Sequence, residues 1–188
     1  MKITFSLETK SINKAKRRLR YYKNQLPKKC KKFVEELAYK GIFVGATNTG
    51  EYGKYILFSM EITEENATGA KGIMYAEKQG DIIARWIGPG ASIREAVVNP
   101  LLMAEFGSGA KASDEAGKEN ARWAPLAGSG RGTFPGQIHA NEDMWYWMDL
   151  EGNWQNSSGT EPKMPVFQAY IEMKDQVESV ARKVFKTK

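Results

Sequence analysis

The hydrophobic and polar positions of the chain follow a helical period near its N-terminus. From Ser11 to Gly41 the apolar residues recur every three or four positions, which places them on one stripe of an α-helix. This stripe consists of Ile12, Ala15, Leu19, Tyr22, Leu26, Cys30, Phe33, Val34 and Leu37. Ser11 suits the N-cap of the helix. Gly41 suits its end, unless residues 42–44 extend it by one turn.

Pro27 lies inside this helical pattern. Proline has no backbone N–H, and its ring clashes with the preceding turn. The sequence therefore predicts either a kink near residues 25–28 or two helices in series.

The next part of the chain alternates with the period of two that is typical of strands. Strands are predicted at residues 2–7, 55–62, 71–78 and 81–87. In the second of them, Ile56, Phe58, Met60 and Ile62 share one face. Gln79 and Gly80 predict a tight turn that pairs the last two strands. We expect the four strands to form one antiparallel sheet that covers the helix stripe.

Beyond the sheet, glycine and proline divide the chain. Gly88–Gly90 is expected to end the sheet, and residues 92–98 to form a helical turn. Asn99 and Pro100 predict the N-cap and first residue of a short helix that Gly107 ends. Residues 107–140 are rich in glycine and predict a long loop, and residues 144–148 and 154–156 predict a hairpin.

The C-terminal residues 165–186 again follow a helical period, with Pro165 near the first position. Its predicted stripe consists of Phe167, Tyr170, Met173, Val177, Val180, Ala181 and Val184. The fold class is therefore α+β: an antiparallel sheet of about four strands packed by a long N-terminal helix and a C-terminal helix, with a loop and hairpin insertion. We expect a single domain over residues 1–188, with 108–163 as the insertion.

Positive charge is concentrated in the first fifth of the chain. Residues 1–40 contain thirteen lysines and arginines against three glutamates, a net charge of +10, whereas residues 41–188 contain fifteen against nineteen, a net charge of −4. Between Lys10 and Lys32 there are eleven basic residues and no acidic one, and all but Lys16 and Lys23 lie away from the apolar stripe. This asymmetry indicates a polyanionic partner, or an oligomer whose basic helix meets an acidic surface of its neighbour. The contact residues we expect are Arg17, Arg18, Lys28, Lys29 and Lys32.

Candidate catalytic chemistry is sparse. His139 is the one histidine, and Glu142 and Asp143 follow it in a loop-like segment without a nucleophile or metal-binding motif. Residues 128–132 (GSGRG) lack the Lys-Ser/Thr ending of a phosphate-binding loop. We therefore predict no enzyme activity, no cofactor and no metal.

Other residues with possible chemistry have simpler interpretations. The single Cys30 lies on the apolar stripe and is expected to be a core thiol in a reducing compartment. The tryptophans at 123, 145, 147 and 154 either stack on bases or sugars, or pack the loop region against the sheet or a neighbouring subunit. No apolar run reaches the length of a membrane span, and the N-terminus lacks the apolar stretch of a signal peptide, so we expect a cytoplasmic protein without membrane contact.

Two short segments together resemble a family of tailed-phage proteins. Residues 102–109 (LMAEFGSG) and 159–173 (GTEPKMPVFQAYIEM) resemble the neck or tail-completion proteins of the head–tail junction, often described as minor tail components. The matching positions are Glu105, Phe106, Gly107 and Ser108 in the first segment, and Pro165, Phe167 and Ala169 in the second, where Val166 is inserted. The Thr49-Gly50 turn also resembles the family's turn after the long helix, without its usual preceding proline. Residues 108–163 are longer than a minimal member needs.

The resemblance implies a structural virion protein that assembles as a ring, expected to be a hexamer, between the connector and the tail tube. It would reside in the host cytoplasm before assembly and in the virion afterwards. Phe106 and Phe167 would anchor the two ends of the loop, and Glu105 is either an ion-pair partner for the basic helix of a neighbour or a helix surface residue. The alternative is a nucleic-acid-binding module that uses the basic helix at residues 10–32.

Overall fold

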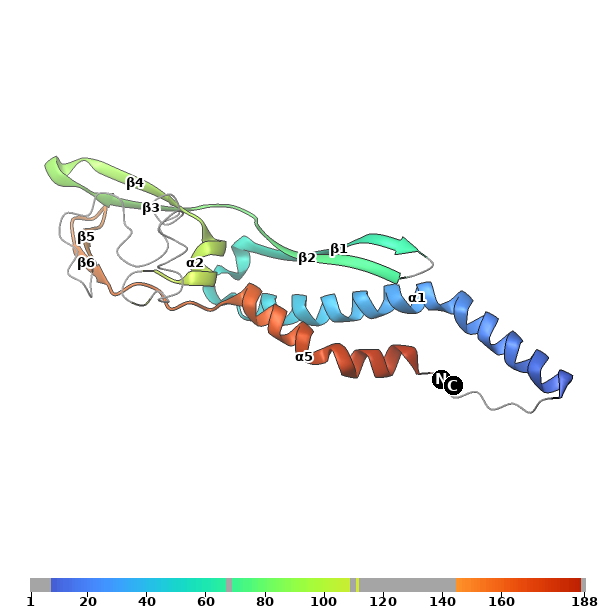
Figure 1. Ribbon diagram of the computed structural model, residues 1–188. Coiled ribbons are helices and arrows are strands. Elements are labelled where there is room, and N and C mark those ends of the chain that lie inside the picture. The colour runs from blue at the N-terminus through green and yellow to red at the C-terminus, as the bar shows by residue number, and fades with distance from the viewer. Residues whose placement is uncertain (1–7, 67–68, 109–110, 112–144, 187–188) are drawn as a thin grey trace. The chain divides into compact units, whose positions relative to one another are not determined.

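The protein combines helices and antiparallel strands, as the α+β prediction requires. The computed structural model describes residues 8–66, 69–108, 111 and 145–186 (Figure 1). The elements are α1 (Thr9–Thr47), the 3-10 helix η1 (Gly50–Tyr55), β1 (Ile56–Asn66), β2 (Gly69–Lys78), β3 (Ile82–Ile87), η2 (Pro89–Ala91), β4 (Ile93–Val98), α2 (Pro100–Phe106), β5 (Trp145–Met148), β6 (Trp154–Ser157) and α5 (Pro165–Phe185). The predicted strand at residues 2–7, His139, residues 128–132 and most of the loop at 107–140 lie outside the described residues.

Helix α1 is longer than predicted and continuous. It begins at Thr9, so the prediction of Ser11 as N-cap is wrong, and it runs through Pro27 and Gly41. The predicted alternative of two helices in series is therefore wrong. Figure 1 shows the blue N-terminal part of α1 at an angle to the rest, which agrees with the predicted kink. Gly41 continues the helix because packing holds it there. A Cβ at this position would lie 2.8 Å from Met173 Cγ and 2.9 Å from Met74 Sδ.

The strands form two sheets instead of one. β1 pairs with β2 in a two-stranded sheet, and the order of the second sheet is β4-β3-β5-β6. One register pair, Ile87 with Met148, joins the β3–β4 hairpin to the β5–β6 hairpin. The predicted pairing of 71–78 with 81–87 is thus wrong. A two-residue hairpin turn needs positive φ angles, and neither Gln79 nor Gly80 has one.

Strand β4 replaces the helical turn predicted at 92–98. It pairs with β3 in antiparallel register, from Ile82 opposite Val98 to Ile87 opposite Ile93. The glycines expected to end the sheet instead make the turn between these strands: Gly90 has a φ of 77°, and the Gly88 amide donates to the Ser92 carbonyl at 2.8 Å. The predicted hairpin at 144–156 and both predicted bounds of α2 are confirmed.

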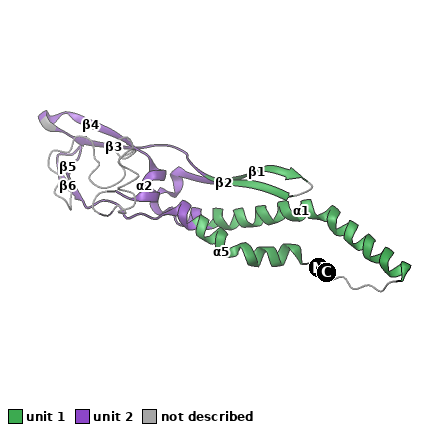
Figure 2. Ribbon diagram, in the orientation of Figure 1, with its two compact units in different colours: residues 1–43, 59–75, 169–188 green, residues 44–58, 76–168 purple. Residues whose placement is uncertain are grey.

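The chain divides into two compact units (Figure 2), unit 1 with residues 1–43, 59–75 and 169–188, and unit 2 with residues 44–58 and 76–168. In unit 1, α1 has the β1–β2 hairpin on one side and α5 on the other. A Cβ on Gly72 would lie 2.7 Å from Val34 Cγ1, so the glycine lets β2 approach the helix. On the other side, the rings of Phe33 and Phe185 have centroids 5.7 Å apart. The single domain with an insertion at 108–163 stays a prediction.

The buried stripes differ in part from those predicted. On α5 the buried residues are Pro165, Ala169, Val180 and Val184, whereas Phe167, Tyr170 and Val177 are 45–54% exposed. On α1, Leu19 is 53% exposed and Cys30 is only partly buried. Among the described residues of the predicted α1 stripe only Ala15 is buried, and the others are partly buried or exposed.

Unit 2 has its own small core. Its buried apolar residues are Tyr52, Ile56, Phe58, Val98, Met103 and Ala104. A Cβ on Gly45 would lie 2.5 Å from Phe58 Cε1, so the phenylalanine ring packs directly on the end of α1. Helix α2 packs against η1. Ala104 of the first motif belongs to this core, and Pro165 of the second motif is also buried in unit 2.

Candidate functional site

The first motif lies on and just after helix α2, and both ends of this helix are well defined. The Asn99 side chain accepts hydrogen bonds from the amides of Leu101 at 3.0 Å and Leu102 at 3.3 Å, which satisfies two N–H groups of the first turn. Gly107 ends the helix with a φ of 71°. The Ala104 side chain is fully buried, so the C-terminal part of α2 is held against the core.

The backbone joins this motif to the second one. The Ala104 carbonyl accepts from the amides of Lys163 at 2.8 Å and Met164 at 3.1 Å. Ser108 and Thr160 exchange amide-to-carbonyl hydrogen bonds of 2.9 and 3.1 Å. We call residues 104–108 together with 160–167 the motif cluster. Segments more than fifty residues apart in sequence are thus fixed side by side within unit 2.

Glu105 has a specific role in the motif cluster. Its carboxylate accepts hydrogen bonds from the amides of Val166 at 2.8 Å and Phe167 at 3.1 Å, which are otherwise unsatisfied donors in the first turn of α5. Partial burial raises the pKa of Glu105, and the two backbone hydrogen bonds act in the opposite direction. Glu105 therefore caps α5, a role that the sequence analysis missed. A glutamate at the end of one helix gives no sequence signal that it caps another.

The other motif residues divide between buried and exposed positions. Pro165 is fully buried, and Phe106 is partly buried. Phe167 is 49% exposed, and its expected role as an anchor of one end of the loop stays a prediction. At Gly107, a Cβ would lie 2.3 Å from the Thr160 carbonyl oxygen and 2.8 Å from the Pro162 nitrogen. The close approach of the two segments thus requires glycine at this position.

The basic helix contributes to a cleft in unit 1. Lys28, Lys29 and Lys32 of α1 line a volume of about 240 Å³ together with Glu36 of α1 and with Lys183 and Val184 of α5. We call this the lysine cleft. Three of its lysines were predicted as contact residues, but Lys183 was not, because its neighbourhood depends on how α5 packs. Arg17 and Arg18 lie outside the cleft, on the exposed surface of α1.

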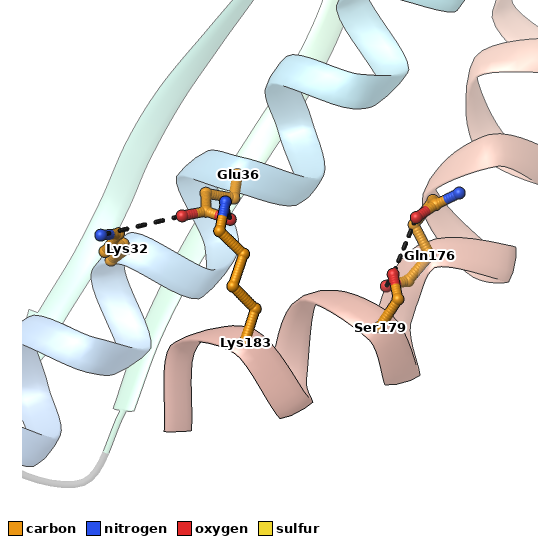
Figure 3. A network of polar contacts seen from close by, with 5 residues as sticks. All are labelled: Lys32, Glu36, Gln176, Ser179 and Lys183. Carbon is orange, nitrogen blue, oxygen red and sulfur yellow. Dashed lines mark hydrogen bonds and ion pairs between the residues drawn. The ribbon is translucent and has the colours of Figure 1, made fainter. Parts of the chain in front are cut away.

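One carboxylate organises the charges of the lysine cleft (Figure 3). Glu36 pairs with Lys183 at 2.8 Å and with Lys32 at 3.8 Å. Lys29 donates to the Lys186 carbonyl at 3.4 Å and lies 5.4 Å from the centre of the Tyr22 ring. The side chains of Lys32 and Lys183 are 63% and 70% exposed. With four lysines and one glutamate, the cleft carries a net charge of +3.

Residues 8–66, 69–108, 111 and 145–186 contain no group of three histidine, cysteine or acidic side chains that could hold a metal ion. Within the same residues, no helix combines the length and apolarity that crossing a membrane requires.

Trp154 is 71% exposed, so it does not pack against the sheet of its own chain.

Comparison with known proteins gives no match. No protein-family model, no curated protein and no solved structure matches this chain.

Proposed function

We propose that the protein is a structural component of the head–tail junction of a tailed phage, a neck or tail-completion protein that assembles as a ring. The ring, expected to be a hexamer, would join the connector to the tail tube. Its work is assembly, and it needs neither catalysis nor a cofactor. Before assembly the chain would reside in the host cytoplasm, and afterwards in the virion.

The observation that carries this proposal is the motif cluster. Each of the two motifs that resemble the phage family is short and unspecific alone. In the fold the two motifs contact each other. Glu105 caps the helix that begins at Pro165, and the absence of a side chain at Gly107 lets the Thr160 carbonyl approach. Because the motif residues act together in one local structure, the resemblance is better explained by a shared fold than by two chance matches.

A second observation supports assembly. One face of the β3–β4 hairpin carries the opposed pairs Ile83–Val97, Arg85–Glu95 and Ile87–Ile93. We call it the hairpin face. Ile83, Val97 and Ile93 are 53%, 53% and 68% exposed. Apolar side chains gathered on one exposed face are typical of protein interaction sites.

The charges of the hairpin face favour another copy of the chain as its partner. Arg85 and Glu95 form an ion pair at 2.8 Å between the two apolar pairs, so the face has no net charge. A neutral apolar face can meet a second copy without like-charge repulsion, and heterologous contacts between identical subunits close into a ring when the rotation permits.

Electron microscopy of the purified full chain, alone and mixed with connector rings of a tailed phage, tests this function. The proposal predicts closed rings of the chain, or chain density added coaxially to the connector. A protein that forms no ring and joins neither connector nor tail would contradict it.

A further inference from the structure

A line of positive charge leads from the lysine cleft along α1. At 100° per residue, Lys14, Arg18, Lys28 and Lys32 lie within one narrow face of the helix, with Tyr21 and Gln25 between them. A rise of 1.5 Å per residue gives this row a length of about 27 Å. No acidic residue occurs between Lys10 and Lys32. The row is therefore far longer than a small anion.

The ion pair in the cleft leaves most of its charge available. Glu36 is shared by Lys32 and Lys183, and the longer of the two contacts measures 3.8 Å. The side chains of Lys32 and Lys183 are 63% and 70% exposed, so a ligand can reach both ammonium groups, although Glu36 itself is only 21% exposed. Lys28 pairs with no carboxylate among the described residues. A ligand with several negative charges can thus replace water at three or four ammonium groups at once.

We propose that the lysine cleft and the basic row of α1 bind the phosphate backbone of duplex DNA without reading its sequence. Lysine ammonium groups on flexible stems suit phosphates as point charges and give little base readout. A duplex carries one charge per about 1.7 Å of its axis, twice the density of one strand, so phosphates are available along the whole length of the basic row. This inference is independent of ring assembly.

The described acidic residues make a second copy the less suitable partner. The densest acidic segment is on β1, and its Glu64 and Glu65 already pair with Lys71 at 3.5 Å and Lys31 at 2.9 Å. On β4, Glu95 pairs with Arg85. These three carboxylates already have basic partners in their own chain, whereas a duplex presents phosphates along its whole length.

Fluorescence anisotropy with a labelled 20-base-pair duplex of arbitrary sequence tests the proposal on the full chain. We expect a Kd below about 1 μM at about 50 mM salt, equal affinity for an unrelated sequence, and a steep fall with salt. In the double variant Lys28→Gln/Lys32→Gln, the slope of log K against log salt should decrease by about 2. The matched control is Lys71→Gln/Lys78→Gln, which removes two exposed lysines outside the cleft and should leave the slope within about 0.5 of wild type.

Glu36→Gln separates a binding role from a structural one. Removal of the one carboxylate should raise the affinity for DNA at least about threefold, because the cleft then carries one more net positive charge. Loss of helix stability alone would lower the affinity instead. The proposal is overturned if wild type does not bind at about 50 mM salt, if both double variants weaken binding equally, or if the cleft variant alters self-association and not DNA binding, which would identify a second copy as the ligand.

Discussion

Glu105 connects two helices through its carboxylate, and its contribution to stability can be measured directly. In Glu105→Ala the amides of Val166 and Phe167 lose their acceptor, so we expect a decrease of about 1 kcal/mol in the free energy of unfolding. Urea denaturation followed by circular dichroism measures it. The control Glu161→Ala changes an exposed glutamate on the neighbouring segment and should stay within about 0.5 kcal/mol of wild type. Equal effects of the two variants would contradict the capping role.

The same variant has a signed pH dependence. Because burial raises the pKa of Glu105, the folded chain keeps the proton at a higher pH than the unfolded chain. The contribution of Glu105 to the free energy of unfolding therefore falls as pH rises from the ordinary glutamate pKa through the raised one. The difference between wild type and Glu105→Ala should be larger at about pH 4 than at about pH 7. An increase over this range would show that the backbone hydrogen bonds outweigh burial.

Gly107 is required for both conformation and space. Its φ of 71° and ψ of −166° suit glycine almost alone, and a Cβ would lie 2.3 Å from the Thr160 carbonyl oxygen. Gly107→Ala should lower the free energy of unfolding by at least about 2 kcal/mol. Gly152→Ala is the matched control, since Gly152 has a φ of 90° but no atom within 4 Å of the added Cβ. Only the conformational penalty of about 1 kcal/mol should remain there. A control as damaging as Gly107→Ala would exclude the close contact as the cause.

At the scale of elements, α1 contains an internal proline that its packing tolerates. Proline in a helix interior is less favourable than alanine by about 3 kcal/mol. Pro27→Ala restores one backbone donor, so we expect it to raise the free energy of unfolding by about 1–3 kcal/mol if the bend is only tolerated. A thermal melt followed by circular dichroism measures this change. A lower stability of the variant would instead show that the packing of unit 1 requires the bend.

The limits of sequence reasoning are clearest in the strands. Helices α2 and α5 were predicted within one or two residues because Asn99, Pro100, Gly107 and Pro165 are local signals. Strand β4 lies where the sequence predicts a helical turn, because its pairing with β3 depends on the turn at residues 88–91. Strand pairing is a non-local property, and short apolar runs do not specify it.

The candidate sites were predictable to different degrees. Lys28, Lys29 and Lys32 could be predicted as contact residues from charge alone. Lys183 joins them only through the packing of α5. The hydrogen bonds of Glu105 could not be predicted either, because their donors, the amides of Val166 and Phe167, lie more than sixty residues away in the sequence. Local patterns indicate which residues carry charge, whereas tertiary packing decides which of them meet.

At the scale of the whole molecule, the hairpin face and the lysine cleft lie on different compact units. Self-association and DNA binding can therefore be changed separately by substitution. Ile83→Asp/Val97→Asp places two charges on the hairpin face and should abolish ring formation while DNA affinity per chain is retained. Leu150→Asp is the control, since Leu150 is 53% exposed but lies in the β5–β6 turn, outside the face.

Native mass spectrometry of the full chain tests the central claim most directly, because it counts the copies in each assembly. For wild type and for Leu150→Asp we expect one closed oligomer, a hexamer, and for Ile83→Asp/Val97→Asp we expect monomers with an unchanged circular dichroism spectrum. Wild-type protein that stays monomeric up to about 100 μM, and that also joins no connector ring, would contradict it.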